Sequence, residues 1–217
     1  MNPTTGQVPQ AVDRQAFERE ARRQGYWLIA GVDEVGRAAW AGPMVAAAVI
    51  LPEAFHPLGI RSSKKMRPAA RQTAYERIVR EATAVAVREA SAADIDARGI
   101  DTCHMDLLRD VVGALVPEPD YVLVDHYTVP GLRQPQKSID VGDDLSVSIG
   151  AASIVAKVTC DRILTAFAQE YPGYGFADNH GYRSDEHLAG LDQLGPCPIH
   201  RRSVSSVRKR LITNDHP

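Results

Sequence analysis

The sequence lacks the features of secreted and membrane proteins. Its three cysteines, Cys103, Cys160 and Cys197, are odd in number and form no CxxC pair, which disfavours a disulfide framework or a zinc site. The longest apolar run, residues 44–51, is too short to span a bilayer. The first residues show no apolar segment behind a basic one, so they do not resemble a secretory signal. These absences predict a cytoplasmic protein with free thiols and no membrane partner.

A strong net charge is also missing, since the formal value is −2, and it gives no reason to expect a nucleic-acid ligand. The distribution is more informative, because basic residues gather in two segments, 61–71 and 200–211. Two basic clusters on an otherwise acidic protein are compatible with a strip that binds phosphates. A solvated helix face and a basic tail explain either cluster alone at least as well.

Hydrophobic periodicity predicts strands and helices in the order of an α/β core with a helical C-terminal lobe. The predicted strands cover residues 27–33, 44–51, 85–88, 121–125 and 136–141; the predicted helices cover 13–24, 67–82, 92–98, 101–115, 145–167 and 185–194. Small residues at positions 150–153 keep one stretch of the long helix thin enough to pack closely on a sheet. We expect residues 1–12 to be disordered, 13–170 to form the core, and 171–217 to form a helical extension with a basic tail.

Acidic residues stand where two of the predicted strands end. Asp33 and Glu34 follow the apolar run WLIAGV, and Asp125 follows YVLV. Burying a carboxylate is unfavourable unless it is paired or binds a metal ion, although a solvent-facing strand end is the simpler explanation for each. In a straight strand the side chains of Asp33 and Glu34 point to opposite faces, so both reach one site only if the chain bends, which Gly36 allows.

A further acid, Asp143, precedes the long predicted helix, where either Asp143 or Asp144 could instead cap the helix N-terminus. Strand ends that meet at one edge of a sheet would gather these carboxylates, which repel one another. Mg²⁺ or Mn²⁺ relieves such repulsion, and two ions can activate water for phosphodiester cleavage. We call these residues the four-acid group: Asp33, Glu34, Asp125 and Asp143.

Several motifs resemble those of bacterial ribonuclease HII, in the same order along the chain. They are AGVDEVGRAAWAGPMVAAAVILP, SSKK, VLVDH, VGDDLSVSIGAASIVAKVTCDR, YPGYGF, HGY and GPCPIHRRS, and they cover roughly residues 13–204. The resemblance implies a ribonuclease H-like α/β fold with a mixed central sheet, flanking helices and a small C-terminal helical lobe. It also implies that the four-acid group is catalytic and binds two Mg²⁺ or Mn²⁺ ions. The implied activity is cleavage of the RNA strand in RNA/DNA hybrids and nicking of duplex DNA 5′ of an embedded ribonucleotide, leaving 5′-phosphate and 3′-hydroxyl ends.

The resemblance further implies which residues bind the substrate. Gly36, Arg37 and Ala38 match a turn whose backbone contacts the 2′-hydroxyl at the RNA–DNA junction, and Tyr182 matches a tyrosine that stacks on the following sugar. Phosphate contacts are expected from Lys64 and Lys157; on the long helix, however, Lys157 could pair with a carboxylate near the site.

Three positions depart from the family pattern. The second glycine of the turn is Ala38, the lysine before the fourth acid is Val141, and a His-Lys-Gly-Tyr motif appears as residues 179–182, Asn-His-Gly-Tyr. The first departure puts specificity for the RNA–DNA junction in question, and the other two are expected to weaken the binding of phosphates.

The leading hypothesis is a monomeric, metal-dependent endonuclease that acts on RNA/DNA hybrids or ribonucleotide-containing duplex DNA. One alternative is a nucleic-acid-binding homologue with weakened cleavage, which the altered turn favours. Another is a different phosphodiester enzyme on a related core, which would cut all-DNA substrates equally fast.

Overall fold

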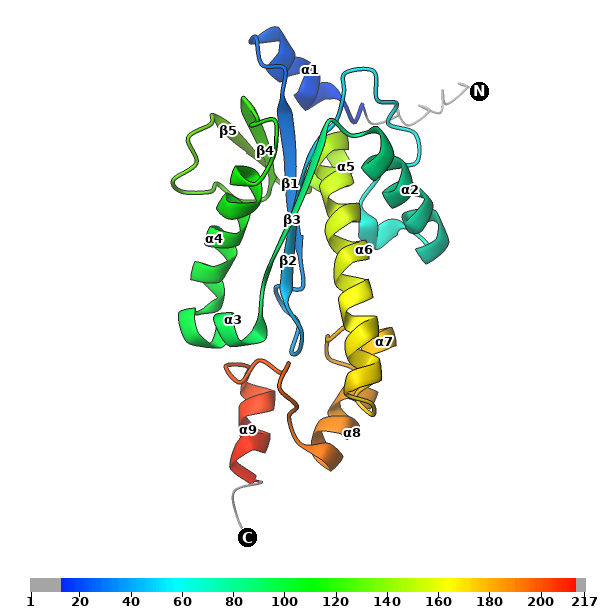
Figure 1. Ribbon diagram of the computed structural model, residues 1–217, viewed down its shortest axis with the longest axis vertical. Helices are drawn as coiled ribbons and strands as arrows, with labels where there is room; N and C mark the ends of the chain where they lie inside the picture. The colour runs from blue at the N-terminus through cyan, green and yellow to red at the C-terminus, as the bar shows by residue number, and fades with distance from the viewer. Residues whose placement is uncertain (1–12, 214–217) are drawn as a thin grey trace, which may run out of the picture.

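A five-stranded mixed sheet forms the centre of the protein (Figure 1). In the computed structural model, which describes residues 13–213, the strands lie in the order β3-β2-β1-β4-β5. Their bounds are β1 Ile29–Val35, β2 Met44–Ile50, β3 Ala84–Ala90, β4 Tyr121–Asp125 and β5 Gln136–Ile139. β2 pairs antiparallel with β1 and β3, whereas β4 pairs parallel with β1 and β5. Because β1 and β4 run in the same direction, their carboxyl ends lie side by side.

Helices cover both faces of this sheet (Figure 1). On one face lie α3 (Ala92–Arg98) and α4 (Ile100–Gly113); on the other lie α2 (Pro68–Glu81), α5 (Gly142–Leu145) and α6 (Val147–Glu170). A short helix, α1 (Ala16–Arg23), precedes the sheet, and the 3-10 turn η1 (Ser63–Lys65) precedes α2. The predicted α/β fold class, with its mixed sheet and flanking helices, is confirmed.

The composition of β2 explains how two helices approach a single strand. Every residue of β2 is buried, and Ala46 and Ala48 pack into the core on the α4 side while Ala47 and Val49 pack into the core on the α6 side. Such uniform burial is expected of a central strand that is covered on both faces. On β1, a Cβ atom at Gly31 would lie 2.0 Å from the backbone carbon of Ser148, so only glycine permits the observed approach of α6. Ala151 and Ala152, in the small-residue stretch of the long helix, share an apolar cluster with Ala47 and Val49 of β2, which confirms that this stretch packs on the sheet.

Three further helices follow α6: α7 (Phe176–Asn179), α8 (Asp185–Leu194) and α9 (Ser205–Thr213). Tyr174, Phe176 and Leu191 from this region share one apolar cluster with Val45 of β2 and Leu164 of α6. The segment therefore packs onto the sheet and the second half of α6. Its treatment as a separate lobe, over residues 171–217, stays a prediction, and the predicted disorder of residues 1–12 lies outside the described part of the chain.

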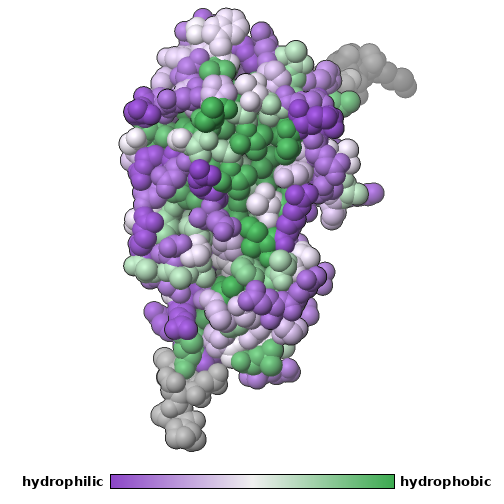
Figure 2. Space-filling view, in the orientation of Figure 1, coloured by the Kyte–Doolittle hydropathy of each residue, from purple (hydrophilic) through white to green (hydrophobic). Residues whose placement is uncertain are grey.

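Apolar side chains form a strip down the middle of the face shown in Figure 2, between polar surfaces on both flanks. Among the described residues, no helix is both long enough and apolar enough to cross a membrane.

The prediction of one long helix over residues 145–167 was wrong at the N-terminal end of this helix. The chain forms the short helix α5, breaks at Ser146, and begins α6 at Val147. Ser146 has an extended backbone, with φ −118° and ψ 132°, and its side chain accepts a hydrogen bond from the Ile149 N–H. Ser146 is therefore the residue that caps the long helix, because its hydroxyl satisfies an amide that has no partner within the helix.

Candidate active site

Asp33 and Glu34 lie on opposite sides of the end of β1. Both belong to the strand, which continues to Val35, so their side chains alternate as in regular β-structure. Asp33 is buried on the α6 side, where Ser153 donates a hydrogen bond to it. Glu34 points to the α4 side, and its Oε2 lies 3.2 Å from Nε2 of His104. The predicted bend at Gly36 comes only after both acids, so it does not turn their side chains to one face.

Asp125 lies beside Asp33 at the same edge of the sheet. The parallel register pairs Val32 with Val124, so the next residue on each strand is an acid and both acids face the α6 side. The Gly142 N–H donates a 2.7 Å hydrogen bond to Oδ1 of Asp125, which ties the end of β4 to the start of α5. This pairing of strand ends is what the sequence predicted for Asp33 and Asp125.

The structure separates the roles of the two neighbouring acids on α5. Asp143 is buried and faces Asp33 and Asp125. Asp144 instead forms ion pairs with Lys65, at 2.5 Å, and with Arg14, at 3.5 Å. Burial opposes the ionisation of Asp144, but these two cations outweigh it and lower its pKa. Since Ser146 caps the long helix, neither acid has the capping role that was considered for it.

Burial and, after it, repulsion between the carboxylates determine the electrostatics of Asp33 and Asp125. Burial raises the pKa of Asp33 well above its usual range, and the charges of Glu34, Asp125 and Asp143 raise it further against the hydrogen bond from Ser153. Burial also raises the pKa of Asp125, followed by the charge of Asp143. Neither Asp33 nor Asp125 forms an ion pair with a cationic side chain of the described residues.

Buried acids without a cationic partner fit a site for divalent cations, because such cations relieve repulsion between carboxylates. Within residues 13–213, however, no three histidine, cysteine, aspartate or glutamate side chains are already arranged around one point where an ion could bind.

A tight turn, residues 36–38, follows β1. Gly36 has φ +86°, and a Cβ atom there would lie 2.7 Å from the Pro43 carbonyl oxygen, so glycine is required. The Gly36 N–H donates to the Tyr182 hydroxyl at 3.1 Å, which places Tyr182 directly against the turn. Ala38 is exposed and does not have positive φ, so its backbone conformation is one that alanine tolerates.

Arg201 supports this turn from behind, and sequence reasoning missed it. It belongs to the basic segment 200–211, one explanation of which was a solvated tail, yet it is only 1% exposed. Its guanidinium donates to the Arg37 carbonyl oxygen at 2.9 Å and to the Gly42 carbonyl oxygen at 3.1 Å. Burial lowers the pKa of Arg201 to about 10. No local signal distinguishes it from its neighbours, because the contacts that bury it lie some 160 residues away in sequence.

The two lysines predicted to bind phosphates are in different situations. Lys64, on η1, is exposed and makes no hydrogen bond or ion pair within the described part of the chain. Burial raises the pKa of Tyr182, and the nearby charge of Lys64 opposes this rise. Lys157 forms a 2.6 Å ion pair with Asp161, which also pairs with Arg71. The second explanation for Lys157, a pair with a carboxylate, is therefore the one observed.

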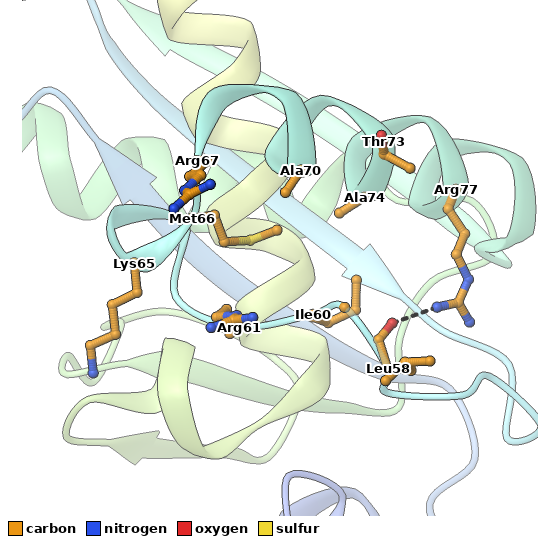
Figure 3. A pocket seen from close by; sticks show the side chains of 11 residues that line it. Leu58, Ile60, Arg61, Lys65, Met66, Arg67, Ala70, Thr73, Ala74 and Arg77 are labelled. Atoms are coloured by element: carbon orange, nitrogen blue, oxygen red, sulfur yellow. Dashed lines mark hydrogen bonds between the residues drawn. The ribbon is translucent and has the colours of Figure 1, made fainter.

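A cavity of about 500 Å³ lies between α2 and the loop before it, next to this region (Figure 3). Arg61, Lys65 and Arg67 line it on one side, and Arg77 donates a hydrogen bond to the Leu58 carbonyl oxygen on the other. None of the four-acid group lines it, so we do not assign the reaction to this cavity.

Known proteins resemble this chain in both sequence and fold. The family model for ribonuclease HII matches residues 30–208. Ribonuclease HII of Geobacter sulfurreducens is 46% identical over 195 residues, covering 90% of each chain. The ribonuclease H2 structure from Pyrococcus horikoshii superposes with a TM-score of 0.74 at 24% identity, covering 85% of this chain and 97% of that one. The structure of Bst-RNase HIII in complex with Mn²⁺ superposes with a TM-score of 0.66 at 18% identity, covering 96% of this chain and 77% of that one. The two structural likenesses concern the fold alone.

Proposed function

This chain belongs to the ribonuclease HII family, and we propose that its four-acid group holds the divalent cations with which it hydrolyses RNA. As a ribonuclease HII, it is a metal-dependent endonuclease that cleaves the RNA strand of RNA/DNA hybrids. The observation that carries the assignment is the gathering of Asp33, Asp125 and Asp143 near one edge of the sheet, where Asp33 and Asp143 are buried and Asp125 is partly buried, with pKa values raised at Asp33 and Asp125 by burial and by neighbouring acids. Divalent cations would offset this repulsion between the carboxylates.

Two Mg²⁺ or Mn²⁺ ions suit this donor set, because hard cations prefer carboxylate oxygens. A related fold has been solved with Mn²⁺, in Bst-RNase HIII. When bound, two such ions supply an activated water for attack on the phosphodiester and offset the charge on the leaving oxygen. The products would carry 5′-phosphate and 3′-hydroxyl ends.

The turn at residues 36–38 is suited to reading the 2′-hydroxyl. Three of its backbone polar groups are already used, since the Gly36 N–H donates to Tyr182, the Gly36 carbonyl accepts from the Ala39 N–H, and the Arg37 carbonyl accepts from Arg201. The amides of Arg37 and Ala38 have no hydrogen-bond partner in the described structure, so they are available to a substrate. Because the 2′-hydroxyl distinguishes RNA from DNA at a given site, we assign the recognition of an RNA–DNA junction to this turn. This also supports nicking 5′ of a single embedded ribonucleotide.

Tyr182 and Lys64 complete the proposed substrate site. The Tyr182 hydroxyl is fixed by the Gly36 N–H, so its ring is held beside the turn and can stack on the sugar that follows the ribonucleotide. Lys64 is exposed and unpaired among the described residues, and a phosphate contact there would set the register of the duplex. Lys157 is already paired with Asp161, so its contribution to phosphate binding is expected to be small.

The proposal extends to the setting in which the protein acts. We propose that it acts in the cytoplasm as a monomer, on RNA/DNA hybrids and on duplex DNA that contains ribonucleotides. Three free cysteines support a reducing compartment.

The test compares Asp125→Asn with a matched control, Asp140→Asn. Asp140 stands close to Asp143 in sequence, but its side chain is 84% exposed and pairs with His126. Each protein is given an RNA/DNA hybrid, a DNA duplex with one ribonucleotide and an all-DNA duplex, with Mg²⁺, with Mn²⁺ or with EDTA. We expect the wild type and Asp140→Asn to cut the first two substrates only when a cation is present, and Asp125→Asn to cut neither while remaining folded.

Three results would contradict the proposal. Substantial turnover by Asp125→Asn at saturating Mg²⁺ would remove the four-acid assignment. Binding of the duplexes by the wild type without any cleavage would favour a nucleic-acid-binding homologue. Cleavage of the all-DNA duplex as fast as the hybrid would favour a different phosphodiester enzyme.

A further inference from the structure

His104, on α4, is a fully buried histidine without a hydrogen-bond partner. Its side chain is 1% exposed, and neither Nδ1 nor Nε2 makes a hydrogen bond within the described residues. One edge contact, with a ring-centroid distance of 4.6 Å, joins it to Tyr127. The polar group that approaches it is the carboxylate of Glu34, whose Oε2 lies 3.2 Å from Nε2. At that distance the pair is close, but the N–H is not yet well aligned on the oxygen.

Burying an imidazole without a partner is unfavourable, so such a residue persists where its polar atoms have a function. The surroundings of His104 are apolar: Cys103, Leu107 and Leu108 of the same helix belong to the core cluster that packs on this face of the sheet. A leucine would fill this space at lower cost. The role of the His104 imidazole must therefore involve the Glu34 carboxylate, which lies 3.2 Å from Nε2.

Glu34 needs a partner on this side of the sheet. Because the side chains of β1 alternate, Glu34 points away from the face on which Asp33, Asp125 and Asp143 gather. A flexible glutamate at a strand end can adopt several rotamers, most of which would place its carboxylate away from the other acids. A group that fixes one carboxylate oxygen would restrict these rotamers and leave the second oxygen for a cation.

We propose that His104 is a positioning residue for Glu34: its Nε2–H holds Oε2 and thereby orients the carboxylate for cation binding. Partners of this kind behind a metal ligand commonly change metal affinity or activity by about 10–100-fold when they are removed. The inference rests on the proposed function, because it presumes that Glu34 binds a cation. It goes beyond that function by assigning a role to a residue that touches neither substrate nor cation.

The experiment measures Mn²⁺ binding without nucleic acid, by isothermal titration calorimetry, in His104→Leu, His104→Gln and Leu108→Ala. The leucine variant removes the N–H donor and keeps the space filled, whereas glutamine retains an N–H donor at a similar distance. Leu108→Ala is the matched control, because Leu108 is equally buried on α4 but apolar. We expect His104→Leu to weaken Mn²⁺ binding by about 10–100-fold, His104→Gln to lose less, and Leu108→Ala to lose thermal stability while binding Mn²⁺ as the wild type does.

Kinetics provide a second readout. With His104→Leu, the Mn²⁺ concentration for half-maximal cleavage should rise while the KM for the hybrid stays near that of the wild type. A His104→Leu change should add little to the loss in Glu34→Gln, because His104 acts only through the Glu34 carboxylate. If the leucine variant does not fold, His104→Met, which also lacks an N–H donor, takes its place.

Unchanged or tighter Mn²⁺ binding by a folded His104→Leu protein would overturn the inference, and so would equal losses in the glutamine and leucine variants. Either result leaves the proposed function intact, since that function is tested separately by Asp125→Asn. Conversely, cleavage by Asp125→Asn would remove the proposed function whatever the His104 variants do.

Discussion

Replacing Asp33 with asparagine is expected to stabilise the protein without divalent cations and to remove the stabilisation that cations provide. Asp33 is 6% exposed, and its ionised form is opposed by burial and by the charges of Glu34 and Asp125. Asparagine has the same shape and can still accept the 2.7 Å hydrogen bond from the Glu34 N–H. The change therefore removes a repelling charge without leaving a cavity.

The expected magnitude follows from linkage. Each unit by which folding raises the pKa of an acid lowers the free energy of unfolding by about 1.4 kcal/mol, at a pH above both the folded and the unfolded pKa. Removal of one repelling charge should therefore raise the free energy of unfolding by on the order of 1–2 kcal/mol. For a chain of this size, that raises the melting temperature by about 2–8 °C in EDTA. A cation at 100 times its dissociation constant stabilises the wild type by about 2.7 kcal/mol, or about 5–11 °C. The order of stability of wild type and variant should therefore reverse when Mg²⁺ is added.

The pH dependence has a definite sign. Because the folded-state pKa of Asp33 lies above its unfolded value, the folded protein retains a proton that the unfolded chain releases. The contribution of Asp33 to the free energy of unfolding of the metal-free protein should therefore fall as pH rises from about 4 to the raised pKa, so the difference in stability between wild type and Asp33→Asn should change with this sign.

Differential scanning calorimetry in EDTA and in Mg²⁺ tests these expectations, with Asp144→Asn as the control. Asp144 is the neighbour of Asp143 but pairs with Lys65 and Arg14, so its removal should destabilise the protein in EDTA. The reasoning would be refuted if Asp33→Asn melted below the wild type in EDTA, or if Mg²⁺ stabilised this variant as much as it stabilises the wild type.

Three further predictions concern other parts of the chain. If the Ala38 methyl crowds the ribose, Ala38→Gly should raise nicking at a single ribonucleotide relative to cleavage of a long hybrid; an unchanged ratio would exclude crowding. Val141 is 59% exposed and has φ +58°, a backbone conformation that is strained for a β-branched residue. Val141→Gly should therefore raise the melting temperature by about 2–4 °C, and a lower melting temperature would contradict this strain. Burial and the neighbouring His187 lower the pKa of His200 to about 4. As the pH drops from about 6.5 to 4, the unfolded chain therefore binds a proton at His200 that the folded protein does not bind. The contribution of His200 to the free energy of unfolding should fall by on the order of 3 kcal/mol over this range. Melting curves across this range, with an NMR titration of His200, check the last prediction, and a His200 pKa near 6.5 would refute it.

The sequence by itself determined the secondary structure and most of the site. Apolar runs and helical spacing predicted β4 and α8 with their observed bounds, because these patterns reflect burial on one or both faces of an element and need no knowledge of its neighbours. The first strand was predicted over residues 27–33, two residues too early at each end, so that Glu34 lies within β1 and not after it. The position of Asp33 and Asp125 at strand ends likewise predicted that they meet, since parallel neighbouring strands end at the same edge.

Local patterns did not separate neighbouring residues of the same type. Asp143 and Asp144 are adjacent acids at one short helix, and either fits a helix cap by sequence. The approach of Lys65 from η1 and of Arg14 from the N-terminal side assigns Asp144 to ion pairs and leaves Asp143 with the other acids. The same holds for the helix break, which depends on where the Ser146 hydroxyl lies.

The tertiary structure alone decided which residues support the site from a distance. His104 reaches Glu34 across 70 positions of sequence, and Arg201 reaches the turn at residues 36–38 across 164. In the sequence, one looks like a polar residue on an amphipathic helix and the other like part of a basic tail. Their roles arise from which surfaces pack together, and that is set by the sum of contacts along the whole chain rather than by any segment of it.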